Sequence, residues 1–315
     1  MLEENGYEKI TRKAMVQPMN HPTLTIFTPT YNRAHLLPVL YKSLTEQTCK
    51  DFQWLIVDDG SGDDTEAVVR GFQQEGLVPI RYHRQENGGK YMAHNQGVRM
   101  CDTELFACVD SDDHLYPDAV ESILAVWERF KDDPKVCGVL SIMDMGGHSR
   151  FVNPPEKGTI MELFSRGQCI GENTATYRTE VLKAHLFPEI PGERFLSECV
   201  MFYPIDRKYV MAINNHYVSI GAYQCDGLTA NLRRIEWENP SATLVMLGSI
   251  AAYHTDLKTA VKGYGSYLAW KTVRKAVLPA TWTLPKVSFK VRLGGWLLYL
   301  PYCYKHWKRK EEFTA

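Results

Sequence analysis

Short apolar runs that alternate with helix-like segments constrain the fold of this 315-residue chain most strongly. The runs cover residues 24–28, 52–57, 80–83 and 105–109. Apolar residues at helical spacing follow them, such as Leu36, Leu40 and Leu44 after the first run. The runs are almost continuously apolar, as strands must be when helices cover both faces of a sheet. The pattern predicts an α/β fold built on a mainly parallel sheet.

A polar cluster stands at the end of each of these four runs. The clusters are Thr28–Asn32, Asp58–Ser61, Asn87–Lys90 and Asp110–Asp113. In open parallel sheets, ligands bind beyond the carboxyl ends of the strands, and those ends meet at one edge. We therefore expect the four clusters to form a single site.

The cluster Asp110-Ser111-Asp112-Asp113 carries three carboxylates within four residues. Crowded carboxylates repel one another unless a cation is present. Hard oxygen ligands suit Mg²⁺ or Mn²⁺, which combine one or two carboxylates with phosphate oxygens. The alternative is a solvated turn in which Asp113 helps to cap the helix that Pro117 opens. The position directly after a buried strand favours the metal site.

The other three clusters have both a functional and a structural interpretation. The Asp58-Asp59 carboxylates could accept hydrogen bonds from a uracil or a ribose, or they could close an ordinary turn. Tyr31 offers a face on which a nucleobase can stack, and Arg33 offers a positive charge. Gly88 permits close backbone approach, and Lys90 could neutralise a diphosphate. The chain contains neither GxxxxGK[ST] nor GxGxxG, which disfavours a P-loop or a dinucleotide-binding fold.

Together the motifs resemble the family-2 inverting glycosyltransferases of the GT-A fold. The matching stretches are TIFTPTYNR, SLTEQT, FQWLIVDDGSGDDT, ENGGKYMAHNQGV and LFACVDSDDHLYPDAV, all within residues 23–130. The resemblance implies a Rossmann-like nucleotide-binding sheet and a UDP-sugar donor. It implies that Asp110, Asp112 and Asp113, as a DxD motif, hold Mn²⁺ or Mg²⁺. The sugar nucleotide is then expected to contact Pro29, Thr30, Tyr31, Arg33, Asp58, Asp59, Gly88, Lys90, Asn95, Asp110, Ser111 and Arg233.

The resemblance also implies an acidic catalytic base in the second half of the domain. We assign this role to Glu198, which the family pattern places just before a helix, although Cys199 stands where a second acid is usual. Glu193 and Asp226 are the competing candidates. Glu198 could also be only an acidic residue that favours the start of a helix. The segment around Gly227 resembles a flexible flap, from which Arg233 or Arg234 could reach the diphosphate.

The C-terminal part differs from the rest in charge. Residues 257–310 contain twelve lysines and arginines and no aspartate or glutamate, and Trp296–Tyr302 is apolar and aromatic. This combination favours an interfacial anchor on an anionic membrane surface. The alternative is a helix packed on the catalytic domain or on a second subunit. The chain has no apolar stretch long enough to span a bilayer, and its scattered cysteines predict a reducing compartment, hence a cytoplasmic location.

These observations predict a tail (1–21), a catalytic domain (22–235) and a C-terminal helical segment (236–315). The nucleotide-sugar half of the catalytic domain is residues 22–135, and the acceptor half is residues 136–235. The function predicted is transfer of a sugar to a glycan or lipid-linked acceptor in bacterial surface polysaccharide synthesis. The net charge of −1 excludes nucleic acid as a partner, and a homo-oligomer is compatible with this picture. The alternatives are a sugar nucleotidyltransferase and a non-catalytic nucleotide-binding scaffold.

Overall fold

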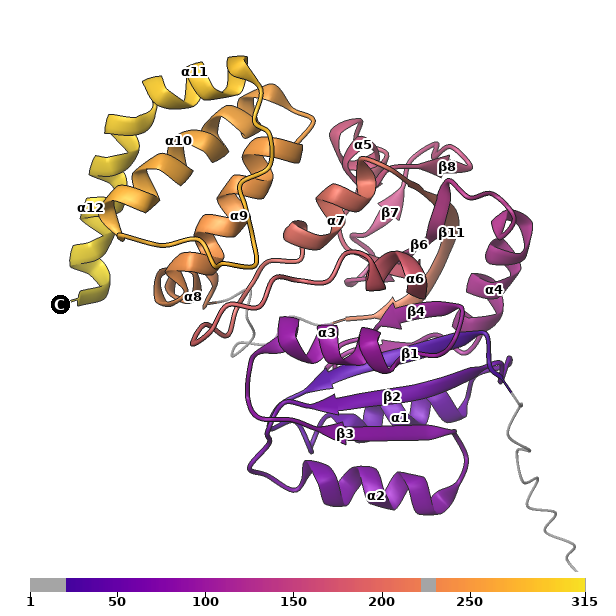
Figure 1. Cartoon of the computed structure of the whole chain (residues 1–315). Helices are drawn as coiled ribbons and strands as arrows, with labels where there is room; N and C mark the ends of the chain where they lie inside the picture. Colours follow the sequence, from indigo (N-terminus) through magenta and orange to yellow (C-terminus); the bar gives the residue numbers. More distant parts are fainter. Residues whose placement is uncertain (1–20, 222–230, 315) are drawn as a thin grey trace, which may run out of the picture.

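The structure is a computed structural model that describes residues 21–221 and 231–314. The candidate base Asp226 and the predicted tail, apart from His21, lie outside these residues. The elements, drawn in Figure 1, are β1 (Leu24–Thr30), α1 (Leu37–Thr45), β2 (Phe52–Asp58), α2 (Thr65–Glu75), β3 (Ile80–Arg84), α3 (Lys90–Met100), β4 (Leu105–Cys108), β5 (His114–Leu115), α4 (Ala119–Phe130), β6 (Val136–Asp144), β7 (Arg150–Phe151), β8 (Lys157–Gly158), α5 (Ile160–Ser165), β9 (Cys169–Ile170), β10 (Asn173–Arg178), α6 (Thr179–Lys183), α7 (Cys199–Asp206), β11 (Val210–Ile220), α8 (Leu232–Glu238), α9 (Pro240–Tyr253), α10 (Leu257–Val273), α11 (Phe289–Leu297) and α12 (Tyr299–Thr314).

A single mixed sheet forms the centre of the N-terminal part. Its strand order is β3-β2-β1-β4-β10-β6-β11-β5, and β8 pairs with β11. Strands β1 to β4 are parallel to one another, β10 runs antiparallel to both β4 and β6, and β11 is parallel to β6. The mainly parallel α/β sheet predicted from the sequence is confirmed, and all four predicted strands are present.

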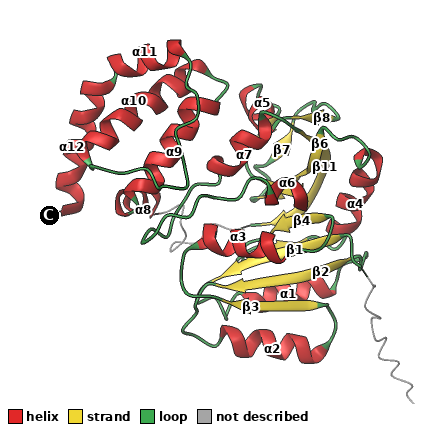
Figure 2. Ribbon diagram, in the orientation of Figure 1, coloured by secondary structure: helices red, strands yellow, loops and turns green. Residues whose placement is uncertain are grey.

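Helices cover both faces of this sheet, as Figure 2 shows. One face packs against α1, α2 and α4 through residues such as Leu40, Phe72 and Trp127. The other face packs against α3, α6 and α7 through residues such as Val98 and Leu182. Burial on both faces explains why β1 and β2 are buried along their whole length, as their apolar sequences predicted.

The C-terminal helices α8 to α12 form a second unit beside the sheet domain (Figure 1). They have a core of their own around Trp237, Leu244 and Trp270. Helix α9 joins the two units, because Ala242 and Val245 belong to the core that lies over the sheet. The predicted boundary at residue 235 falls inside α8, so the unit includes the whole of that helix.

Within the predicted helical segment, α9 and α10 are two separate helices. The chain turns at His254, where the backbone is extended. Asp256 then starts α10 by accepting a hydrogen bond from the Thr259 N–H (2.8 Å). Among the described residues, no helix is both long enough and apolar enough to cross a membrane.

Candidate active site

The four polar clusters lie at one edge of the sheet, as their positions after the strands predicted. Thr30 at the end of β1 pairs in register with Asp58 at the end of β2, and β4 ends beside β1 at Cys108. Lys90 of the third cluster contacts Asp110 of the fourth, with 2.7 Å between Nζ and Oδ2. The four clusters therefore form one continuous surface.

Direct hydrogen bonds tie the first cluster to the second. The Asn32 N–H donates to Ser61 Oγ (2.9 Å), and the Gly62 N–H donates to Asn32 Oδ1 (2.7 Å). Asn32 adopts a positive φ of 54°, which asparagine tolerates better than most residues. This conformation leaves Tyr31 at the surface, with 47% of its area exposed, where an aromatic face is available for stacking.

The carboxylates of Asp58 and Asp59 are buried and already hold donors from the chain. Asp58 accepts hydrogen bonds from the Tyr82 hydroxyl (2.6 Å) and the Ser61 N–H (2.7 Å). Asp59 accepts from the Gly88 N–H (2.9 Å) and the Gly89 N–H (2.7 Å). Both residues thus position neighbouring turns, and a carboxylate with two lone-pair sites per oxygen can still accept a further donor from a nucleotide.

Gly89 lets two distant loops approach each other. Its φ is 91°, and a Cβ there would lie 1.8 Å from the carbonyl oxygen of Arg194. Only glycine fits this position, because any side chain would overlap that backbone. The close approach brings the loop before Glu198 next to the start of α3, where Lys90 is the first residue.

Lys90 links the acidic cluster to the candidate base. Its ammonium lies 2.7 Å from Asp110 Oδ2 and 3.1 Å from Glu198 Oε1. Burial disfavours the charge on Lys90, but the two carboxylates outweigh burial and raise the pKa of Lys90 well above its usual value. The same ammonium lowers the pKa of Glu198. Both groups are therefore charged near neutral pH.

Asp110, Asp112 and Asp113 gather as the sequence predicted. One oxygen from each lies within 4.8 Å of the others. Burial and the charges of Asp110 and Asp112 raise the pKa of Asp113 to about 8. Burial and Asp110 also raise the pKa of Asp112, while Arg33 works in the opposite direction. This mutual repulsion is what a bound cation would relieve.

The acidic cluster also contains an oxygen that lacks a partner. Oδ1 of Asp110 is buried, and it accepts no hydrogen bond among the residues that the structure describes. A buried acceptor without a donor costs free energy, and a hard divalent cation would satisfy it. The three carboxylates therefore fit Mn²⁺ or Mg²⁺.

The structure separates the two described candidates for the base. Both carboxylate oxygens of Glu193 cap α9, accepting from the Ser241 N–H (2.8 Å) and the Ala242 N–H (2.7 Å). Glu198 lies beside Lys90, and 65% of its side chain is exposed. Glu193 is thus a structural residue, whereas Glu198 is available to an acceptor.

Three other predicted site residues have less direct positions. Asn95 is fully buried, and both ends of its amide bond to the Phe187 backbone (2.9 Å each). It therefore joins α3 to a loop, and its contact with the ligand stays a prediction. Ser111 is buried inside the acidic cluster. Arg233 is exposed on α8, next to Arg234, which pairs with Glu238 (2.7 Å).

The sequence motifs did not predict a role for Arg84 and Gln85, at the end of β3. Gln85 donates to Asp59 Oδ1 (2.8 Å), and Arg84 donates to the Ser61 carbonyl oxygen (2.8 Å). His94 lies beneath the site, where burial lowers its pKa to about 4, so its ring is neutral. The sequence signal for Arg84 and Gln85 was their place directly after a strand, between two recognised motifs.

Comparisons with known proteins agree with this arrangement. Over 148 residues the chain is 30% identical to an uncharacterized glycosyltransferase of Rickettsia conorii, covering 46% of this chain and 24% of the relative. Over 108 residues it is 38% identical to validoxylamine A glucosyltransferase of Streptomyces hygroscopicus, covering 33% and 25%. Over 112 residues it is 35% identical to chondroitin synthase of Escherichia coli, covering 36% and 16%. The chain thus matches about a quarter or less of each of these relatives.

Similar solved structures support the fold. The crystal structure of S. aureus TarS 1-349 in complex with UDP-GlcNAc has a TM-score of 0.56 and 15% sequence identity, covering 90% of this chain and 91% of that one. The sequence model of glycosyl transferase family 2 matches residues 25–186, just over half of the chain, and this range includes all four clusters. The chain belongs to glycosyl transferase family 2.

Proposed function

We propose that this protein is an inverting glycosyltransferase that moves a sugar from a UDP-sugar to an acceptor hydroxyl. The observation that carries the proposal is the Asp110–Lys90–Glu198 arrangement, which sets a proposed metal ligand, a cation and an exposed carboxylate side by side. Membership of the family supports sugar transfer. A solved structure of similar fold, TarS, is in complex with UDP-GlcNAc, which supports UDP as the nucleotide.

The donor nucleotide lies along the first two clusters in this proposal. Tyr31 stacks on the base, and the buried Asp58 and Asp59 fix the turns that surround it. The hydroxyl oxygen of Thr30 is buried and has no hydrogen-bond partner among the described residues, so it is available to a ligand at the end of β1. Pro29, Arg33, Gly88 and Ser111 complete the surface, and Arg233 approaches from α8.

Asp110, Asp112 and Asp113 are the proposed ligands of Mn²⁺ or Mg²⁺. A cation held by these carboxylates would supply positive charge that offsets the charge on the leaving UDP. Lys90 adds a second positive charge, with its ammonium 2.7 Å from Asp110 Oδ2. This ammonium stabilises the negative charge that develops on the leaving group.

Glu198 is the proposed general base. Its exposed carboxylate takes the proton of the acceptor hydroxyl, whose oxygen then attacks the anomeric carbon opposite the diphosphate. A single displacement inverts the configuration at that carbon. When Lys90 turns to a bound diphosphate, Glu198 loses its ion pair and becomes a stronger base.

The acceptor is proposed to be a glycan or a lipid-linked sugar, in the synthesis of a bacterial surface polysaccharide at the inner face of the membrane. The observation behind this is an apolar face on α11 and α12, whose exposed side chains are Phe289, Leu293, Trp296, Leu297, Leu300, Tyr304 and Trp307. Phe289 is 77% exposed and Leu300 is 73% exposed. Lys290, Arg292, Lys305 and Lys308 lie among them, which suits an anionic lipid surface. Association of the chain into a homo-oligomer is compatible with the same face.

The test of the base assignment compares Glu198→Gln with Glu193→Gln. With Mn²⁺ and a panel of UDP-sugars, Glu198→Gln should bind UDP normally while sugar transfer and UDP release fall roughly 1,000-fold. Glu193→Gln should keep most of its activity, because Glu193 caps a helix. Full activity of Glu198→Gln would assign the base elsewhere. Binding without turnover by the unaltered protein would indicate a scaffold, and release of pyrophosphate from UTP would indicate a nucleotidyltransferase.

A further inference from the structure

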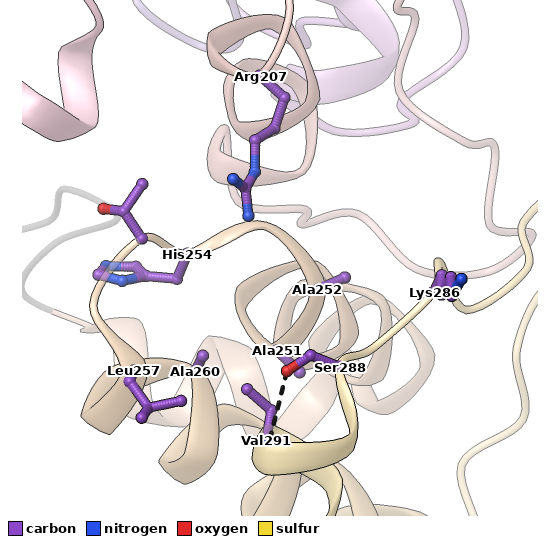
Figure 3. A pocket seen from close by; sticks show the side chains of 10 residues that line it. Arg207, Ala251, Ala252, His254, Leu257, Ala260, Lys286, Ser288 and Val291 are labelled. Carbon is purple, nitrogen blue, oxygen red and sulfur yellow. Dashed lines mark hydrogen bonds between the residues drawn. The ribbon is translucent and has the colours of Figure 1, made fainter.

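A cavity of about 370 Å³ lies where the C-terminal helices meet the end of α7. None of its lining residues belongs to the four clusters of the active site. Figure 3 shows Arg207, the C-cap residue of α7, reaching towards the turn that precedes α10, with His254 and Lys286 on either side. The volume falls in the range of ligand sites, which form preferentially between structural units.

The charged groups of this cavity are positive and unpaired. The side chains of Arg207 and Lys286 form no ion pair or hydrogen bond with any residue in the described parts of the chain. No carboxylate from the described residues lines the cavity. The adjacent Asp256 is occupied, since its Oδ2 accepts from the N–H (2.8 Å) and the hydroxyl (2.7 Å) of Thr259. The positive charge of the cavity therefore favours the binding of an anion.

Neutral donors add to these two cations. Ser288 is the N-cap of α11, and it lines the cavity with Val291 of the first turn, so the positive end of that helix dipole is adjacent. Nδ1 of His254 accepts the Asp256 N–H (3.1 Å), which leaves the proton of the neutral ring on Nε2. A guanidinium, an ammonium and a helix N-terminus around one space form a typical phosphate-binding set.

The remaining wall of the cavity is apolar. It includes Ala251, Leu257 and Val291, from three different helices. A free phosphate ion would leave this wall without contacts, whereas a phosphate ester with an apolar substituent would cover it. Helix α7 begins directly after Glu198 and ends at Arg207, so its eight residues separate the cavity from the active site by about 12 Å along the helix.

We propose that this cavity binds a phosphate monoester with an apolar substituent, whose phosphate is held by Arg207 and Lys286. The ester could be a soluble molecule or the headgroup of a lipid, because both present the same chemistry. The proposal does not depend on sugar transfer, since it rests on groups outside the active site.

The first experiment measures binding of hexyl phosphate to the full chain by calorimetry in the presence of EDTA, which prevents metal-dependent anion binding at the acidic cluster. The double variant Arg207→Gln/Lys286→Gln should bind at least tenfold more weakly than the unaltered protein. The matched control is Lys258→Gln/Lys262→Gln, which removes two charges from α10 at positions that do not line the cavity. It should keep the unaltered affinity. Melting temperatures measured without ligand confirm that all variants fold.

The second experiment identifies the source of the phosphate. Vesicles of phosphatidylcholine with phosphatidic acid are compared with vesicles that contain phosphatidylglycerol at equal surface charge. A preference for phosphatidic acid that Arg207→Gln/Lys286→Gln abolishes would assign the cavity to a lipid headgroup. Binding of hexyl phosphate without such a preference would assign it to a soluble ester. Equal affinity of both double variants for hexyl phosphate would overturn the proposal, as would the absence of any binding in both experiments.

Discussion

At the scale of single residues, Lys90 is the group on which the proposed chemistry depends most. It contacts the proposed metal ligand Asp110 on one side and the proposed base Glu198 on the other. The sequence reading predicted only the diphosphate contact, because nothing near Lys90 in the chain indicates Glu198. The second contact depends on Gly89. Because glycine has no Cβ, the backbone of the loop at Arg194 can pack directly against it.

Replacing Lys90 by methionine should change both the rate and its pH dependence. Loss of the charge beside the diphosphate should lower kcat/KM roughly 100-fold. Lys90 lowers the pKa of Glu198 in the free protein, so its removal raises that pKa. Since Glu198 acts only when deprotonated, the acid limb of the kcat/KM profile should move to higher pH.

The pH profile of UDP release checks this prediction. Lys42→Met is the control, because Lys42 is an exposed lysine on α1 that pairs only with Glu46 (3.8 Å). A Lys90→Met profile with an unmoved acid limb would show that Lys90 does not control the ionisation of Glu198.

At the scale of elements, the strands could be predicted from the sequence, and the contacts of the loop before Glu198 could not. Continuous apolar runs such as Phe52–Val57 can be buried on both faces only as central strands, so local sequence identifies them. The sequence around Glu193 and Glu198 does not predict their different roles. The backbone N–H groups that bind Glu193 belong to α9, almost fifty residues later in the chain. The hydrogen-bond partner of Asn95 could not be predicted for the same reason, since it is the distant Phe187.

Glu193→Ala should therefore weaken the fold. It leaves two N–H groups at the start of α9 without a charged acceptor, which costs about 2 kcal/mol and lowers the melting temperature by several degrees. Glu189→Ala is the control, because Glu189 forms only an exposed ion pair with Arg99, worth about 0.5 kcal/mol. Thermal unfolding measures both. Equal, small losses would mean that the cap does not stabilise α9.

At the scale of the whole molecule, two units of different character are joined by α9. The sheet domain carries the four clusters, and the C-terminal unit carries the exposed apolar face. The sequence predicted the basic, helical nature of residues 236–315. It did not predict which side chains of that segment would face outwards, because the inner side is fixed by contacts such as those of Gly265 with Gly295.

The apolar face predicts binding to anionic vesicles. Replacing both Trp296 and Leu300 by serine should abolish sedimentation with phosphatidylglycerol vesicles, because it removes two exposed anchors while leaving the basic residues. Val39→Ser/Leu77→Ser is the control, since these exposed apolar residues lie in the sheet domain. Persistent vesicle binding by the Trp296→Ser/Leu300→Ser variant, or no binding by the unaltered chain, would contradict the role of this face.

The central claim is that the acidic cluster and the sheet edge form a metal-dependent site for a UDP-sugar. The most direct measurement is calorimetric binding of UDP with and without Mn²⁺, with GDP as the competing nucleotide. The account predicts that UDP binds at least tenfold more tightly with Mn²⁺, and that Asp112→Asn removes this gain while the exposed Asp118→Asn keeps it. UDP affinity that is the same with and without Mn²⁺, and unchanged in Asp112→Asn, would contradict the metal site, and a response to GDP alone would contradict the donor.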